Sequence, residues 1–252
     1  MVGANASPVT KLMDLKEEEA LGADASGHWY YVSKARAIRD LARSAGGGRA
    51  PQPVLDIGAG SGVIARMMLK EGVASRVRCV DLHYEADWIA AHSDDEISFH
   101  TSVTPGEESL VLMIDVIEHV EDDVALLKEA ADNVPSGARF VVSAPAFQFL
   151  WSSHDVFLEH HRRYTAAMMR RSIEAAGLNP LTVRFFYGGI FPVAAVVKTL
   201  DRLRGGAPKS QMGGVPGPLN AALIAAHDVE RAVLFPLNAL AGVTVFCLAE
   251  KP

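Results

Sequence analysis

The sequence predicts an α/β fold built on a doubly wound, mostly parallel sheet of seven strands. Short apolar runs of strand length alternate along the chain with segments of helical spacing, which is the pattern of βαβ units with helices on both faces of a sheet. A glycine-rich turn directly follows the first of these strands and precedes a helix. The length of 252 residues suits one such domain with an elaboration.

Each predicted element is an apolar segment bounded by turn residues. Strands are expected at residues 53–58, 76–82, 97–101, 109–119, 138–146, 181–188 and 242–250, the fourth running into a helix. Helices are expected at residues 16–20, 28–45, 61–72, 121–134 and 165–177. Because ligands bind at the carboxyl ends of the strands in such sheets, the segment after the fifth strand is expected on the site side.

The chain divides into three predicted regions. Residues 1–50 form an N-terminal helical cap, and residues 51–187 with 241–252 form the core. Residues 188–240 are predicted as a helical lid inserted before the last strand, because two apolar helical segments flank a glycine-rich connection at 205–218. This lid carries an apolar helical stripe formed by Leu219, Leu223, Ala226, Val229 and Val233.

Composition and net charge argue against some classes of function and favour others. A net charge of −6 disfavours nucleic acid, whose phosphates require a basic surface. Cys79 and Cys247 lie in apolar runs and are expected as buried free thiols in a reducing compartment. The first residues lack the apolar segment of a signal peptide, and Pro236 and Asn238 interrupt the longest uncharged run. We therefore expect a cytoplasmic protein.

The turn "VLDIGAGSG" is the most informative motif. Its glycines are spaced too closely for the G-x-G-x-x-G of a dinucleotide site, because Gly62 comes one residue early. Asp56 precedes the turn, where a carboxylate repels a pyrophosphate, and Asp81 ends the second strand, where it can accept hydrogen bonds from a ribose diol. The two acids favour a cationic, phosphate-free nucleoside. A sugar-nucleotide or NAD site is the alternative.

On these residues the chain resembles the class I S-adenosylmethionine-dependent methyltransferases, over about residues 28–187 and the last strand. The resemblance implies S-adenosylmethionine as cofactor, with Leu82 against the adenine, Thr101 or Ser102 in place of the usual acid or amide after strand three, and Tyr30 against the sulfonium. The cofactor contacts that it implies are Asp56, Gly58, Ala59, Gly60, Gly62, Asp81, Leu82, Thr101, Ser102, Asp115, Val116 and Tyr30.

The segment "MIDVIEHVEDD" is predicted to lie at the reacting end. Asp115, Glu118 and His119 share one face if a helical turn begins there. A similar motif binds a divalent metal in ubiquinone-pathway O-methyltransferases and small-RNA 2′-O-methyltransferases, but we do not favour a metal because Asp115 replaces their longer glutamate. The simpler prediction is His119 as general base. His119 as a packed core residue, with Glu118 as a helix-start charge, is the other interpretation.

The segment "WSSHDVFLEHHRRYT" resembles a bacterial methyltransferase subgroup with W-S-x-H-D and H-x-R-R-Y. We interpret it as the acceptor wall, with His154 or His161 as alternative bases. The predicted substrate contacts are Trp151, His154, Asp155, Arg163 and Tyr164. The alternatives are a buttressing role, or an exposed helix in which Glu159 pairs with Arg162 or Arg163.

The sequence thus predicts a methyltransferase that methylates oxygen or nitrogen of a small-molecule or lipid-linked acceptor by in-line transfer. The apolar stripe of the lid either packs on the core, or forms a hydrophobic tunnel or a contact with the inner face of the membrane for a lipid-linked acceptor. A metal-dependent RNA 2′-O-methyltransferase, an NAD-dependent reductase and a catalytically silent scaffold stay open. The acceptor and the oligomeric state are not predicted.

Overall fold

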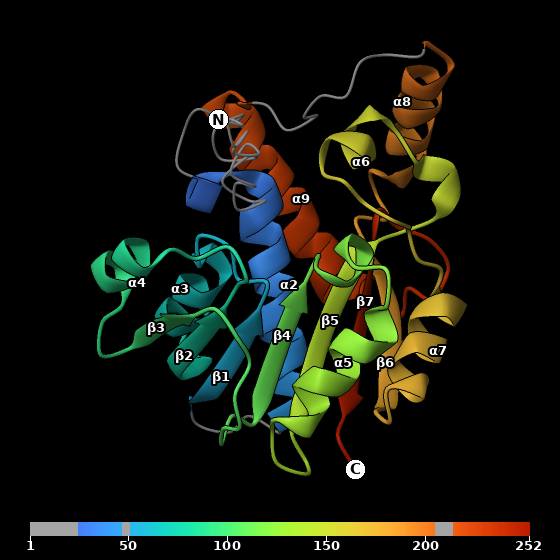
Figure 1. Ribbon diagram of the computed structural model, residues 1–252. Helices are drawn as coiled ribbons and strands as arrows, with labels where there is room; N and C mark the ends of the chain where they lie inside the picture. The colour runs from blue at the N-terminus through green and yellow to red at the C-terminus, as the bar shows by residue number, and fades with distance from the viewer. Residues whose placement is uncertain (1–24, 47–50, 205–213) are drawn as a thin grey trace, which may run out of the picture.

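The computed structural model describes residues 25–46, 51–204 and 214–252 (Figure 1). The helix predicted at residues 16–20 and most of the glycine-rich connection lie outside these ranges. No helix among the described residues is long and apolar enough to cross a membrane.

The seven strands form one sheet in the order β3-β2-β1-β4-β5-β7-β6. Neighbours from β3 to β5 are parallel, and β7 runs antiparallel to both β5 and β6. The bounds are β1 (Gln52–Ile57), β2 (Ala74–Val80), β3 (Ile97–His100), β4 (Leu110–Ile114), β5 (Arg139–Pro145), β6 (Asn179–Phe186) and β7 (Thr244–Glu250). The predicted fold class is therefore confirmed.

Helices cover both faces of this sheet. Figure 1 shows α5 and α7 in front of the strands and α2 and α9 behind them. The helical elements are η1 (Ala25–Gly27), α2 (Trp29–Gly46), α3 (Val63–Lys70), α4 (Ala86–His92), η2 (Ile117–His119), α5 (Asp123–Asp132), η3 (Gln148–Leu150), α6 (Ser153–Phe157), α7 (Ala166–Ala175), α8 (Phe191–Arg204) and α9 (Gly217–Val233). The chain thus alternates strand and helix as its hydrophobic pattern predicts, with α4 as an additional short helix.

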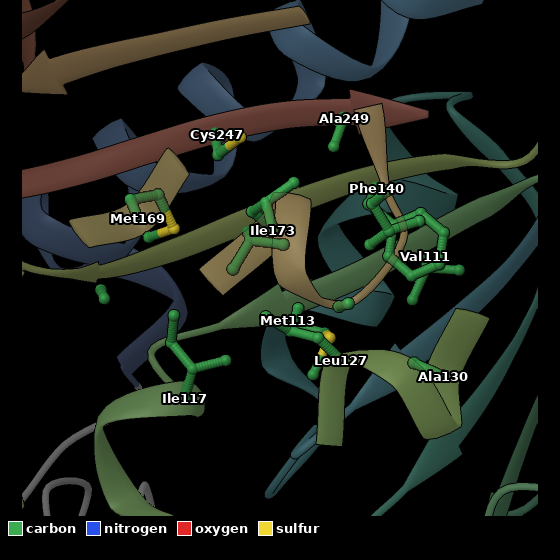
Figure 2. Close-up of a cluster of buried hydrophobic side chains, with 14 of the residues drawn as sticks. Val111, Met113, Ile117, Leu127, Ala130, Phe140, Met169, Ile173, Cys247 and Ala249 are labelled. Carbon is green, nitrogen blue, oxygen red and sulfur yellow. The ribbon is translucent and has the colours of Figure 1, made fainter. Parts of the chain in front are cut away.

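Each face of the sheet has its own hydrophobic core. Figure 2 shows one of them, where Val111 and Phe140 of β4 and β5 meet Leu127 of α5 and Ile173 of α7. All four side chains are fully buried. On the opposite face, α2 packs against β5 and α3 against β2. Both cysteines are buried and free, as predicted.

The two helices of residues 188–240 have different neighbours. α9 packs along α2, where Asp228 pairs with Arg36 and Arg231 pairs with Asp40. α8 instead contacts η3, and the Asp201 carboxylate accepts a hydrogen bond from the backbone of Ser153 in α6. The described residues of this region thus form the two helical segments expected from the sequence, and their role as a lid stays a prediction.

Candidate active site

A cavity of about 290 Å³ opens at the carboxyl ends of β1 and β4. Its wall combines the N-terminal turns of α2, the glycine turn after β1, η2, the 154–163 segment and the inner side of α8. These parts lie far apart in sequence, and the switch in strand order between β1 and β4 brings them together.

At Gly58, the first glycine of the turn, a residue with a side chain is disfavoured for two reasons. Its φ of 69° lies in the left-handed region, which a residue with a side chain rarely adopts. A Cβ atom at this position would also stand 2.5 Å from Cγ2 of Val116. The turn is further held by the Tyr84 hydroxyl, which donates to the Gly60 carbonyl at 2.6 Å. The backbone is thereby fixed at the cavity wall, where a ligand can approach it closely.

The nucleoside end of the cavity is acidic. Asp56 of β1 is almost fully buried, and Asp81 lies just beyond β2, where its carboxylate accepts from the backbone of His83. The glycine turn and the end of β2 contribute neither Lys nor Arg to the wall. These donor and acceptor groups fit a cationic nucleoside with a ribose diol and do not fit a pyrophosphate.

A partly buried ion pair joins α2 to the end of β4. Lys34 is 2% exposed and pairs with Asp115, which also accepts from the Ser143 hydroxyl at 2.8 Å. Burial alone would raise the pKa of Asp115, but the Lys34 ammonium and these hydrogen bonds hold it below its usual value.

The structure corrects the predicted helical face at this point. Asp115 has a φ of 55°, and the following turn, η2, begins only at Ile117. Asp115 therefore does not share a helical face with Glu118 and His119.

Three side chains converge at the reacting end, and we call them the Glu118 cluster: Glu118, His119 and His160. One ligand atom from each lies within 4.8 Å of the others, so within the described part of the chain these three side chains could hold a metal. The Glu118 carboxyl is fully buried, and neither of its oxygens has a hydrogen-bond partner among the described residues. Burial, and then the neighbouring charge of Asp115, raise the pKa of Glu118 well above its usual value.

Asp155 organises the histidine- and arginine-rich segment from within. It is fully buried and binds Arg163 through two hydrogen bonds, from Nε at 2.6 Å and from Nη2 at 2.9 Å. Its Oδ1 also contacts Nδ1 of His160 at 2.9 Å. Burial would raise the pKa of Asp155, but the bonds to His160 and Arg163 hold it far below its ordinary value. The segment is thus a folded network and not an exposed helix.

α8 contributes a buried lysine to the cavity. Lys198 is 9% exposed, lines the cavity and donates to the Ser152 hydroxyl at 3.1 Å. Burial and the nearby charge of Arg163 lower its pKa to about 8, against the opposing effect of Asp155 and Asp201.

Residues 28–183 match the sequence model of the methyltransferase domain family. The chain belongs to this family. A ubiquinone biosynthesis O-methyltransferase of Aeromonas salmonicida is 24% identical to this methyltransferase over 202 residues, covering 69% of this chain and 84% of the relative. Its counterpart from Sodalis glossinidius is 27% identical over 123 residues, covering 45% and 49% of the two chains.

The fold of the methyltransferase is also that of solved structures. A SAM-dependent methyltransferase of Archaeoglobus fulgidus superimposes with a TM-score of 0.53 at 16% identity, covering 94% of this chain and 99% of that one. The chain is an S-adenosylmethionine-dependent methyltransferase, and the predicted cofactor and enzyme class are confirmed. The reductase alternative is thereby set aside.

Many of the residues predicted for the site of the methyltransferase line the cavity. They are Tyr30, Asp56, Gly58, Ala59, Gly60, Asp81, Asp115, Glu118, His119, His154 and Arg163. The other predicted residues lie off its wall: Gly62, Leu82, Thr101, Ser102, Val116, Trp151, Asp155, His161 and Tyr164.

Physical reasons explain the main departures. Asp155 is buried behind the wall by its bonds to Arg163, and the Tyr164 hydroxyl donates to Asp123 at 2.8 Å. These contacts favour the buttressing alternative, and direct contact of Asp155 and Tyr164 with the acceptor stays a prediction. His161 is exposed away from the cavity, because the turn directs His160 inward instead. Leu82 is 80% exposed, and its contact with adenine stays a prediction.

Gly62, Val116 and the segment after β3 also lie outside the wall for local reasons. Gly62 backs onto the Phe99 ring, and Val116 packs against Gly58 from behind the turn. Thr101 and Ser102 are exposed beyond β3. Trp151 precedes α6 and is only partly buried.

The wall residues that were not predicted for the cofactor, the base or the acceptor include Lys34, His160 and Lys198. Lys34 and Lys198 lie in helices whose patterns indicate packing, so no local signal distinguishes them. His160 was one of three histidines in one segment, and only the contact with Asp155 selects it.

Proposed function

We propose that this enzyme methylates a hydroxyl oxygen of a small molecule or of the head group of a lipid-like molecule. The observation that carries the proposal is the convergence of two imidazoles, His119 and His160, on the wall of the cavity that holds the glycine turn. Oxygen nucleophiles need their proton removed, and imidazole is the side chain best suited to this at neutral pH. The O-methyltransferase relatives support oxygen over nitrogen.

The residues of the nucleoside end fit the cofactor. The backbone at Gly58 and Gly60 would border its methionine part, the Asp81 carboxylate would accept from the ribose hydroxyls, and Tyr30 would face the sulfonium. When bound, S-adenosylmethionine supplies an electrophilic methyl group. The Lys34–Asp115 pair fixes α2 against the end of β4, which keeps this side of the cavity in place.

We assign the general base to His160. Its Nδ1 lies 2.9 Å from the Asp155 carboxylate, which fixes the tautomer that carries the proton on Nδ1 and leaves Nε2 basic. The ring of His119 packs on that of His160 with centroids 4.6 Å apart. His119, the base predicted from the sequence, thus becomes its neighbour, which positions the ring and the acceptor. His154 lines the same cavity as a further acceptor contact.

The charge around His160 suits an acidic hydroxyl such as a phenol. Arg163 is bound by Asp155, and Lys198 places a second buried cation on this wall. A nearby cation stabilises an acceptor oxygen as its proton leaves.

The test is methyl transfer from S-adenosylmethionine to a panel of phenols, alcohols and amines, with products identified by mass. We expect phenols to be methylated by the wild type. His160→Gln should lose turnover while its affinity for S-adenosylhomocysteine is unchanged, and His92→Gln, on the exposed side of α4, is the matched control. Methylation of amines alone, or full turnover in His160→Gln, would contradict the proposal. A catalytically silent scaffold would bind the cofactor and methylate none of the panel.

A further inference from the structure

The outer face of α8 has an unusual composition for a surface helix. We define this face by five side chains that follow helical spacing: Val193, Val196, Val197, Leu200 and Leu203. They are between 45% and 75% exposed. A surface helix normally turns its apolar stripe toward the core, so five exposed aliphatic side chains on one stripe indicate a binding surface.

The opposite face of α8 already has a place in the site. Ala194 and Lys198, with Ile190 just before the helix, line the cavity. α8 therefore lies between the cavity and the solvent: its inner face lines the cavity, and its outer face is exposed to the solvent. Figure 1 shows its C-terminal end projecting beyond the carboxyl ends of the strands, on the side where the cavity opens.

The charges along α8 identify the kind of surface that fits. Its one acidic residue, Asp201, is turned toward the backbone of Ser153, whereas Arg202 is exposed. The sequence from residue 202 to residue 227 contains no Asp or Glu but has Arg202, Arg204 and Lys209. In a chain of net charge −6, the sequence that follows the apolar stripe is therefore locally basic.

We infer that the outer face of α8 docks on the surface of an anionic lipid bilayer. Aliphatic side chains that enter the boundary between headgroups and acyl chains, with basic residues at the headgroups, give a helix reversible affinity for such a surface. Because the inner face of the same helix lines the cavity, docking would bring the cavity to the membrane. The inference rests on the proposed function by assigning it a lipid-linked acceptor, whose tail stays in the bilayer while its head group enters the cavity.

The experiment is co-sedimentation of the full chain with vesicles. One set contains phosphatidylcholine alone and the other phosphatidylcholine with phosphatidylglycerol, each at low and high salt. We expect binding to the phosphatidylglycerol vesicles that weakens with salt. The double variant L200D/L203D should reduce the bound fraction at least about tenfold, since two leucines leave the lipid.

The matched control is L181D/L237D, which changes two exposed leucines outside α8. It should bind vesicles as the wild type does, and all three proteins should bind S-adenosylhomocysteine equally. Because vesicle binding needs no acceptor and no turnover, its result is separate from that of the proposed function. Equal binding by the two double variants, or no binding by the wild type, would overturn the inference. It would also be overturned if the wild type were a dimer that L200D/L203D dissociates, which would assign the face to a second copy.

Discussion

Asp155→Asn tests whether the histidine- and arginine-rich segment is a folded buttress of the site. The substitution keeps the size of the side chain and removes its charge. It leaves the guanidinium of Arg163, which is 3% exposed, without the carboxylate that binds it through two hydrogen bonds. Breaking a buried pair by removing one partner costs about 3–5 kcal/mol, because the other charge stays buried.

We expect the low end of that range, about 3 kcal/mol, because asparagine can still accept one hydrogen bond. For a chain of this length, the midpoint of thermal unfolding should fall by about 10 °C. Urea denaturation gives the free energy directly. The matched control is Asp132→Asn, whose carboxylate is 62% exposed in an i,i+4 pair with Lys128, and it should cause no measurable change.

The pH dependence gives a second readout of the same pair. The pKa of Asp155 is lower in the folded protein than in the unfolded chain, where it is about 4. The carboxylate therefore adds its full amount to the free energy of unfolding above about pH 4, and this stabilisation is lost as the pH falls through the folded-state pKa. The difference in stability between wild type and Asp155→Asn should therefore shrink below about pH 4. A loss under about 1 kcal/mol at neutral pH would refute the buttress.

Further predictions concern the rest of the cavity. Gly58→Ala should weaken S-adenosylhomocysteine binding more than about tenfold, because its Cβ would stand 2.5 Å from Val116. The control is Gly72→Ala, which has a similar φ of 65° but open space around the added Cβ. It carries the backbone strain without the clash and should leave binding unchanged. The pKa of Lys198 is lowered from 10.5 to about 8 in the folded protein. The free energy of unfolding of the wild type should therefore rise with pH between these two values relative to that of Lys198→Met. Parallel pH profiles of the two proteins would contradict this. EDTA should leave turnover unchanged, because His160 can act as the base only while its Nε2 is free of metal; a loss restored by Mg²⁺ or Mn²⁺ would instead assign the Glu118 cluster to a metal.

The sequence predicts the core of this fold well for a physical reason. Strands buried on both faces are continuous apolar runs, and helices between them keep a period of 3.6, so β1, β4 and α5 are visible without a structure. Gly58 and Asp81 are equally local, because the turn and the strand end that fix them are adjacent in sequence. The nucleoside end of the site could therefore be predicted.

The reacting end could not, because it depends on long-range contacts. His160 and His161 are neighbours in sequence, and only the bond from Asp155 and the local turn decide which of them faces the cavity. Lys34 and Lys198 reach the wall from helices that are separated from the glycine turn by many residues. The helical face predicted for Asp115, Glu118 and His119 is wrong because Asp115 has a φ of 55°. The sequence around an aspartate gives no strong signal that it adopts the left-handed conformation.

The most direct test of the proposed cofactor site is a calorimetric titration of the purified protein with S-adenosylhomocysteine, in wild type, in Asp81→Ala and in the exposed control Asp87→Ala. We expect micromolar binding by the wild type and by Asp87→Ala, and a large loss in Asp81→Ala, because the carboxylate that accepts from the ribose is removed. Absence of binding by the wild type, or equal binding by all three proteins, would contradict the cofactor site at the ends of β1 and β2.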